Sequence, residues 1–460
     1  MIGRHHHKTA EDSLSTDRDN PPSPFVQVLQ KAVEVRPHEV RALVLSFLYY
    51  FLVLSSYYII RPIRDDFGTA GGLDNLPYMF TATLVVMLIA NALFSALVAR
   101  FTRRRFIPIA YRFLLINLLI FAALLLFIPK EHQVWVGRAF FVWTSVFNLF
   151  VVSVFWAFVV DVFDDDQGKR LFGFVSVGGT LGAILGSLIT GSLVRQIGAV
   201  NLLLISAALL ELASQCVRLF PAFQPAATET KKEADRPVGG GMWAGLLHNF
   251  SSPYLLGICA YMLLYSLTST LLYAQQVGIV GAAIPDRLVR TAFFARVDLV
   301  VNILTVIAQI FITGRLLKWF GVGLTLALLP LLTIVGFTGL GFVPSLGFLI
   351  VFLTLRRAGN FAFARPAREN LFTVISREDK YKSKNFIDTV VYRGSDALTG
   401  WLKAAIEMLA HQPAVASIVG AVIALTWAAT GAWLARAQRK LDDSGSVAAV
   451  DVGSAGAARV

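Results

Sequence analysis

EVRALVLSFLYYFLVLSSYYIIRPIRDD is the sequence of residues 39–66, and it joins a long apolar run to a charged end. The apolar part, residues 39–60, is followed at once by Arg61, Arg64 and Asp65. An α-helix rises about 1.5 Å per residue, so about 20 apolar residues cross the roughly 30 Å hydrocarbon core of a bilayer. We therefore predict that residues 39–60 form a membrane-spanning helix that ends in charged side chains.

Eleven more apolar runs of similar length follow along the chain. The twelve predicted spans are residues 39–60, 77–99, 106–128, 136–160, 171–194, 201–219, 253–274, 291–313, 321–342, 344–364, 384–409 and 413–436. Short patterns recur in the same order, since Lys169 stands ten residues before Gly179 and Lys384 stands ten before Gly394. The sequence thus predicts an all-α integral membrane protein with twelve transmembrane helices, in two pseudo-repeated six-helix halves.

The polar stretches divide the chain into five regions, of which two are the halves of the membrane part. We expect a disordered cytoplasmic leader at 1–38, an N-terminal six-helix bundle at 39–219, a cytoplasmic linker at 220–250, a C-terminal six-helix bundle at 251–436 and a disordered cytoplasmic tail at 437–460. The leader and the tail are poor in aromatic residues, which leaves little apolar surface to bury.

The basic residues indicate the orientation. Arg100 and Arg103 follow the second span, Lys169 and Arg170 follow the fourth, and the loops after the ninth and eleventh spans carry almost no positive charge. Because cytoplasmic loops of membrane proteins carry an excess of Lys and Arg, we expect both termini in the cytoplasm. The expected location is the cell membrane (inner or plasma membrane), crossed many times.

The composition excludes several classes of protein. Of the 460 residues, 56% are hydrophobic and 15% are charged, whereas soluble domains carry about 25% charged residues. The net charge of +12 is consistent with nucleic-acid binding, but basic cytoplasmic loops explain it better. We therefore expect the lipid bilayer as a partner and no nucleic acid. Cys216 and Cys259 lie in apolar segments and are expected to be small apolar residues, not a disulfide or a metal site.

The motifs favour gradient-driven transport. No G-x-x-x-x-G-K-[ST] pattern occurs, and no region is large enough for a soluble ATPase domain. His-rich metal spacing and nucleophile–base signatures are also missing from the sequence. We expect a secondary transporter of a small molecule, not an enzyme or a receptor, without catalytic residues, metal or cofactor, and monomeric.

Charged residues at membrane depth are costly and mark candidate functional sites. Arg61 and Arg64 are three residues apart and would share a helix face, although Pro62 is expected to interrupt the helix between them. Arg393 and Asp396 are also three apart and are expected to form an ion pair. The predicted substrate-binding residues are Arg61, Arg64 and Arg393. The predicted gating or coupling residues are Asp65, Asp161, Arg368, Glu369, Lys384, Asp388 and Asp396.

Gly178, Gly182 and Gly186 recur at four-residue spacing in the fifth span. Small residues on one face let helices approach closely in lipid. The spacing therefore predicts a tight helix–helix contact.

Two resemblances to known families follow from these motifs. The six-plus-six plan resembles the major facilitator fold, whose basic motif after the second span is matched by Arg100, Arg103 and Arg104. The chain is more closely similar to the ATP/ADP translocases, a family of nucleotide exchangers. The matching stretches are Tyr58 to Asp65, Phe155 to Asp161, Gly168 to Phe172, Pro366 to Glu369 and Lys384 to Asp388.

The resemblance to ATP/ADP translocases implies a nucleotide or another organic anion as the substrate, moved by exchange. The chain departs from the family pattern at Arg365, where aspartate is usual, and at Asp396, near an expected lysine. These reversed charges leave the substrate open. The alternative is a proton-coupled major facilitator transporter of a neutral or cationic solute, with Asp65, Asp161, Asp388 or Asp396 as the proton carrier.

Overall fold

The computed structural model describes residues 34–100, 103–220, 252–372, 387, 391–410 and 413–457. Residues 1–33 of the predicted leader and nearly all of the predicted linker 220–250 lie outside the described residues. The predicted coupling residues Lys384 and Asp388 also lie outside them. Within the described part every regular element is a helix, which confirms the predicted all-α class.

The long helices form two consecutive groups. The first group is α2 (Val40–Ala70), α3 (Leu76–Arg100), α4 (Arg103–Phe127), α5 (Gln133–Val162) and α6 (Asp165–Leu219). The second group is α9 (Pro253–Ala283), α10 (Arg287–Ala308), α11 (Gly314–Phe342), α12 (Leu346–Gly359), α13 (Arg365–Asn370), α15 (Tyr392–Ala410) and α16 (Pro413–Ala457). Short helical turns η1 to η5 are Pro37–Glu39, Leu73–Asn75, Lys130–His132, Gln309–Thr313 and Asn360–Ala364.

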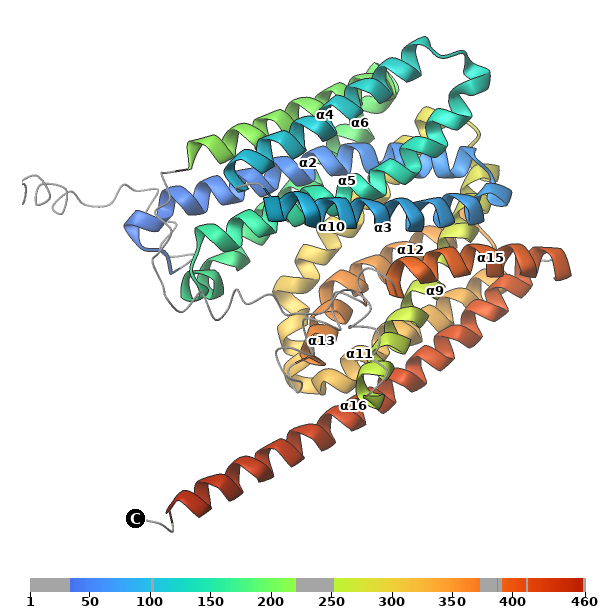
Figure 1. The fold of residues 1–460 in the computed structure, drawn as a ribbon. Coiled ribbons are helices and arrows are strands. Elements are labelled where there is room, and N and C mark those ends of the chain that lie inside the picture. Colours follow the sequence, from blue (N-terminus) through green and yellow to red (C-terminus); the bar gives the residue numbers. More distant parts are fainter. Residues whose placement is uncertain are drawn as a thin grey trace, which may run out of the picture.

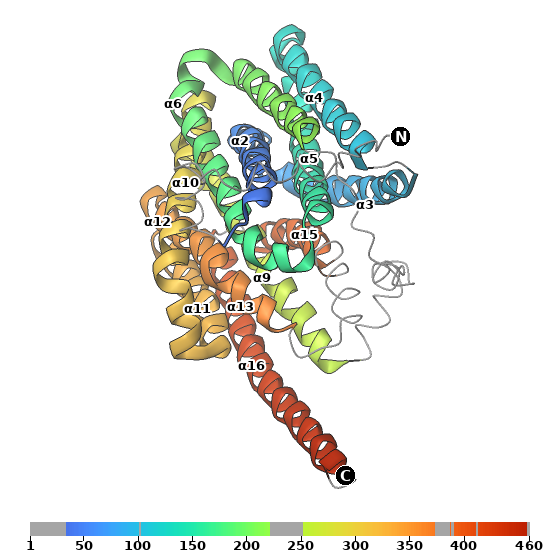
Figure 2. The ribbon, with the colours of Figure 1, turned by 90° about the vertical axis from the view of Figure 1, so that its left-hand side faces the viewer.

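Two of these helices contain a sharp break at a glycine. Gly198 in α6 has a φ of 78° and Gly321 in α11 has a φ of 70°, a left-handed conformation that favours glycine. Figure 2 shows the ribbon of α6 turning back on itself. The break separates the predicted spans 171–194 and 201–219, and the break in α11 marks the start of the predicted span 321–342.

Ten helical segments of the described chain are long and apolar enough to cross a membrane. One of them, Arg170–Leu219, contains two predicted spans because of the break at Gly198. The remaining predicted span corresponds to α15, whose sequence includes Arg393, Asp396 and Lys403 and is therefore more polar. Each of the twelve predicted spans thus has a helix. Most of residues 384–391, where the eleventh predicted span begins, lie outside the described residues, and α15 is described from Tyr392.

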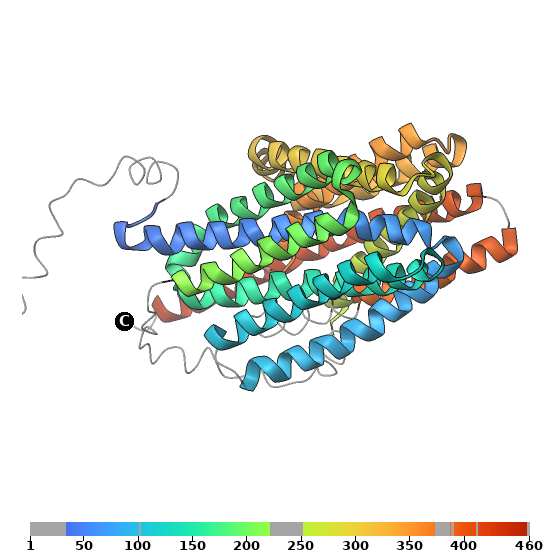
Figure 3. The same ribbon diagram turned by 90° about the horizontal axis from the view of Figure 1, so that it is seen from above.

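The helices run along a common direction, and the two groups form separate halves of the bundle (Figures 1 and 3). One large apolar core fills the first half, and two further apolar clusters fill the second. The halves contact each other through α2, α3 and α6 on one side and α9, α10 and α15 on the other. We call the end of the bundle where α2 begins the Glu39 end, and the opposite end the Gly71 end.

Helix α2 lies tightly against α6, as the glycine spacing predicts. A Cβ atom at Gly178, Gly182 or Gly186 would lie 2.6, 2.2 or 2.5 Å from a backbone oxygen of α2. The backbones therefore approach more closely than any larger residue would permit. Helix α2 also continues unbroken past Pro62, so the expected interruption there is wrong. Neighbouring helices compensate for a proline in a membrane helix.

Helix α16 continues beyond the predicted end of its span at 436 and remains helical to Ala457 (Figure 1). The composition of residues 437–460 predicts a disordered tail instead. The segment 437–457 contains several alanines and no proline, and alanine has the highest helix propensity.

Candidate functional site

A buried carboxylate is shared by two arginines where the halves meet. Oδ1 of Asp298 on α10 lies 3.1 Å from Nη1 of Arg61 on α2 and 2.6 Å from Nη2 of Arg357 on α12. Only 1% of the Asp298 side chain is exposed, and a buried ion needs charged partners because its desolvation is costly. This cluster ties α2 of the first half to α10 and α12 of the second.

Arg64 lies one helical turn further along α2. Its Nη1 atom is 3.1 Å from Oδ1 of Asp65. The guanidinium lies over the ring of Phe141 on α5, 4.0 Å from the centroid, and 6.0 Å from that of Tyr273 on α9. Since aromatic faces attract cations, Arg64 is held between rings from both halves.

Arg393 and Asp396 form the ion pair that their spacing predicts. Nη1 of Arg393 lies 3.4 Å from Oδ2 of Asp396. Oδ1 of Asp396 accepts hydrogen bonds from the hydroxyls of Ser266 and Thr270 on α9, at 3.0 and 2.8 Å. Asp396 also interacts electrostatically with Arg64. This prediction is confirmed, and the pair joins α15 to α9.

The arginines of this region are more exposed than its carboxylates. The side chains of Arg61, Arg64, Arg357 and Arg393 are 17–20% exposed. Asp298, Asp65 and Asp396 are 1%, 8% and 15% exposed. We call these seven residues the central cluster. Its four arginines and three carboxylates leave one positive charge in excess, and the arginine side chains are the more exposed part.

Arg356 adds a further cation beside this cluster. It is buried, and its guanidinium donates hydrogen bonds to the hydroxyls of Thr268 (2.8 Å), Ser269 (3.0 Å) and Thr333 (3.2 Å) and to the Tyr265 carbonyl (3.2 Å). Neutral acceptors satisfy the donors without cancelling the charge. The positive potential around the central cluster is therefore larger than its own residues provide.

A second group of charges links the halves at the Gly71 end. Asp66 on α2 lies 3.1 Å from Nε of Arg287 and 2.7 Å from Nη2 of Arg290, both on α10. At the contact of α3 with α15, the indole nitrogen of Trp401 donates a hydrogen bond of 3.1 Å to the hydroxyl of Thr81. Both contacts fasten the first half to the second.

The other predicted gating residues lie away from the central cluster. Asp161 is in the last turn of α5, and Arg368 and Glu369 are on the short helix α13, all at the Glu39 end. Arg368 lies 3.7 Å from Glu369 and contacts the sulfur of Met262 at 2.9 Å. Their roles in gating stay predictions.

Sequence reasoning missed several residues that these contacts bring together. Asp298 is the single charged residue between Arg296 and Arg315, and a lone carboxylate within a span is itself a signal of function. Arg357 is visible within the predicted span 344–364, but its partner lies on another helix. Asp66 and Arg290 are 224 residues apart in the sequence. A local sequence pattern cannot predict a contact between residues so far apart in the chain.

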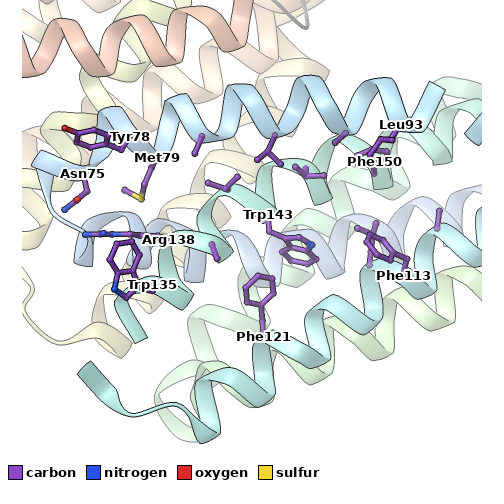
Figure 4. Close-up of a pocket in the computed structure, with 18 of the residues that line it drawn as sticks. Asn75, Tyr78, Met79, Leu93, Phe113, Phe121, Trp135, Arg138, Trp143 and Phe150 are labelled. Carbon is purple, nitrogen blue, oxygen red and sulfur yellow. The ribbon is translucent and has the colours of Figure 1, made fainter. Parts of the chain in front are cut away.

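A large pocket lies elsewhere, between α3, α4 and α5 (Figure 4). It has a volume of about 1280 Å³, and its walls are almost wholly apolar. Asn75, Tyr78 and Arg138 lie at one end, where the guanidinium of Arg138 is 4.5 Å from the Trp135 ring centroid. These helices belong to the first half alone, so this pocket does not connect the halves.

The described residues include no group of three or more His, Cys, Asp or Glu side chains placed to hold a metal ion. Cys216 and Cys259 are free thiols, so they form no disulfide with each other. The central cluster itself and its direct partners are arginine, carboxylate, hydroxyl and aromatic groups.

Solved structures of several transporters share the fold. A POT family transporter, PepTSo, is 14% identical with a TM-score of 0.61, covering 87% of this chain and 98% of its own. A bacterial homologue of the human lysosomal transporter Spinster, in an inward-facing and unoccupied conformation, is 13% identical with a TM-score of 0.58, covering 88% and 99%. The nucleoside transporter NupG is 14% identical with a TM-score of 0.52, covering 88% and 99%. These identities show similarity of fold alone.

The sequence itself matches one family description over most of its length. No curated protein matches the chain. The Major Facilitator Superfamily description matches residues 42–373, a range that extends from the start of α2 past the end of α13 and includes Asp298 and Arg357. The chain therefore belongs to the major facilitator superfamily.

Proposed function

We propose that this transporter carries an organic anion by alternating access and that the anion binds at the central cluster. One observation carries the proposal: partly exposed arginines from both halves cover buried carboxylates. An incoming anion meets the arginine side chains before the carboxylates, and its charge neutralises the excess positive charge of the cluster. Guanidinium forks suit the paired oxygens of phosphate and carboxylate groups.

The placement of Arg61 and Arg357 suits a moving binding site. Both pair with Asp298, yet Arg61 belongs to the first half and Arg357 to the second. An anion between them would take over part of the charge balance that Asp298 now supplies to both. Binding would then change the electrostatic tie between the halves, as alternating access requires.

The resemblance to ATP/ADP translocases supports a nucleotide as the anion. Of its matching residues, Arg61, Arg64 and Asp65 lie in the central cluster. Asp396, where the family pattern has a lysine nearby, pairs with Arg393 in this chain. Sugar phosphates and other organic anions would use the same guanidinium chemistry, so they belong in the same test.

The positive-inside rule supports the Glu39 end as the cytoplasmic end. Arg100 and Arg103 stand at the ends of α3 and α4 there, and Arg170 pairs with Glu39 at 3.0 Å. The contacts of Asp66 and Trp401 fasten the halves at the opposite end. These features support a conformation that is closed on the outside and faces inward.

The test is exchange by the purified full-length protein in liposomes loaded with ATP, ADP or a sugar phosphate. We expect saturable uptake of at least one labelled anion, with an apparent affinity lowered about tenfold or more in R61Q or R357Q, because each loses a charged hydrogen bond. R112Q is the matched control, since Arg112 pairs with Glu211 away from the site. Absence of anion flux in a folded preparation would overturn the proposal.

A proton-coupled carrier of a neutral or cationic solute is the second candidate. Asp396 favours it, because two of its partners are neutral hydroxyls and the carboxyl group is 15% exposed. This candidate predicts uptake that an uncoupler abolishes and that D396N no longer couples to protons. Anion exchange that is insensitive to an uncoupler decides against it.

A further inference from the structure

A second pocket lies on the seam between the halves, at the contact of α6 with α10. It has a volume of about 490 Å³ and is lined by both helices. Figure 2 shows the two helices side by side. Arg195 and Gln196 of α6 and Arg296 of α10 lie in its wall. It is separate from the central cluster, none of whose residues line it.

The charges of this pocket are unbalanced. Both arginines are exposed, and neither has an ion-pair partner among the described residues. Asp and Glu are missing from the residues of the described chain that line it. Ser187, also in the wall, is fully buried, and its hydroxyl has no hydrogen-bond partner in the described structure. Two arginines and a hydroxyl group without a hydrogen-bond partner line the same pocket. Together they suit an anionic ligand with several acceptor oxygens.

The helix faces below the arginines are apolar and exposed. On α6, Leu181 and Leu188 precede Arg195 at intervals of seven residues, which places all three on one face. On α10, Val300 and Ile303 follow Arg296 by four and seven residues and share its face. The two helices run in opposite directions here. On each helix the arginine therefore lies at the end of the apolar stripe that is nearer the Gly71 end.

This surface is complementary to a phospholipid, which has one charged head group and two apolar tails. Gly191 lies beneath the Arg296 stem, whose Cγ would be 3.5 Å from a Cβ at that position. The stem thus lies across α6, and the guanidinium is carried by a helix of the other half. Arginines at the edge of a bilayer are stabilised by lipid phosphates within reach of their long side chains.

We propose that this pocket binds the phosphate of an anionic phospholipid, whose acyl chains lie along the two apolar stripes. The lipid bridges α6 and α10, which belong to different halves, and so favours the conformation in which the halves are closed at the Gly71 end. The proposal does not depend on which substrate the central cluster takes. It commits to a lipid and not to free phosphate because the pocket continues into exposed apolar surface.

Native mass spectrometry of the detergent-purified full-length protein tests it, with phosphatidylglycerol as the probe. We expect R195Q/R296Q to bind phosphatidylglycerol at least about tenfold more weakly than the unchanged protein, while R195K/R296K keeps most of the binding. R138Q is the matched control, because Arg138 lies on α5 in a different pocket. Phosphatidylglycerol binding by R138Q should change less than about twofold.

Three outcomes would overturn the proposal. The first is equal phosphatidylglycerol binding by R195Q/R296Q and the unchanged protein, and the second is an equal loss in R138Q. The third is full displacement of phosphatidylglycerol by inorganic phosphate, which would make the ligand a soluble anion. Thermal unfolding of each lipid-free variant shows whether it is folded. If R195Q/R296Q does not fold, R195K/R296K still tests the proposal, because it keeps both positive charges.

Discussion

At the scale of single residues, Asp298 has the most demanding position. Its carboxylate is almost fully buried and is held by Arg61 and Arg357, which come from different halves. Removing one member of a buried ion pair leaves its partners uncompensated, which costs more than the pair itself contributes. The structure therefore makes Asp298 important for folding as well as for the proposed binding site.

We expect D298N to destabilise the protein by about 3 kcal/mol, because two arginines then face each other without a carboxylate. Titration of the purified protein with sodium dodecyl sulfate measures the change. E211Q is the control, since Glu211 pairs with Arg112 at a more exposed place and its loss should cost less than about 1 kcal/mol. Equal stability of D298N and E211Q would contradict the role of Asp298.

The range of each interaction explains which residues could be predicted from the sequence. Arg393 and Asp396 pair within one turn of helix, so their spacing is sufficient. Arg61 could be identified as a charge at membrane depth, but its partner Asp298 lies on a helix of the other half. The packing of the halves decides that pairing, and no local periodicity reports it.

At the scale of elements, the contact of α2 with α6 depends on glycine. The Cβ of a residue at position 182 would lie 2.2 Å from the Phe51 carbonyl oxygen, which is backbone and cannot rotate away. The four-residue spacing predicts this contact, because it is a property of one helix face. The break of α6 at Gly198 is harder to predict, since many glycines in the chain have ordinary helical geometry.

We expect G182A to destabilise the protein by about 1–3 kcal/mol, because the added methyl group forces α2 and α6 apart. G173A is the matched control on the same helix, since a Cβ there would meet nothing within 4 Å. Alanine at position 173 should be neutral or stabilising by up to about 1 kcal/mol, through helix propensity. Thermal unfolding in detergent compares the two, and a G182A midpoint equal to that of G173A would contradict the close contact.

At the scale of the whole molecule, charges join the halves at two levels. The central cluster couples them through Asp298, and Asp66 couples them at the Gly71 end through Arg287 and Arg290. A transporter that alternates between two openings must break the second set of contacts to open that end. Apolar runs in the sequence predict the spans. The contacts of Asp66 with Arg287 and Arg290 could not be predicted in this way, because they form only when the two halves pack together.

The contacts of Asp66 predict how the two openings are balanced. We expect D66N to raise the population open at the Gly71 end about tenfold or more, because the neutral amide loses the ion pairs with both arginines. A tenfold change corresponds to only about 1.4 kcal/mol. Spin labels at D74C and A282C, one in each half, report the opening as a longer distance in a C216S/C259S background. E131Q is the control, since Glu131 is exposed at the same end within the first half. An unchanged distance distribution in D66N would show that Asp66 does not hold the closure.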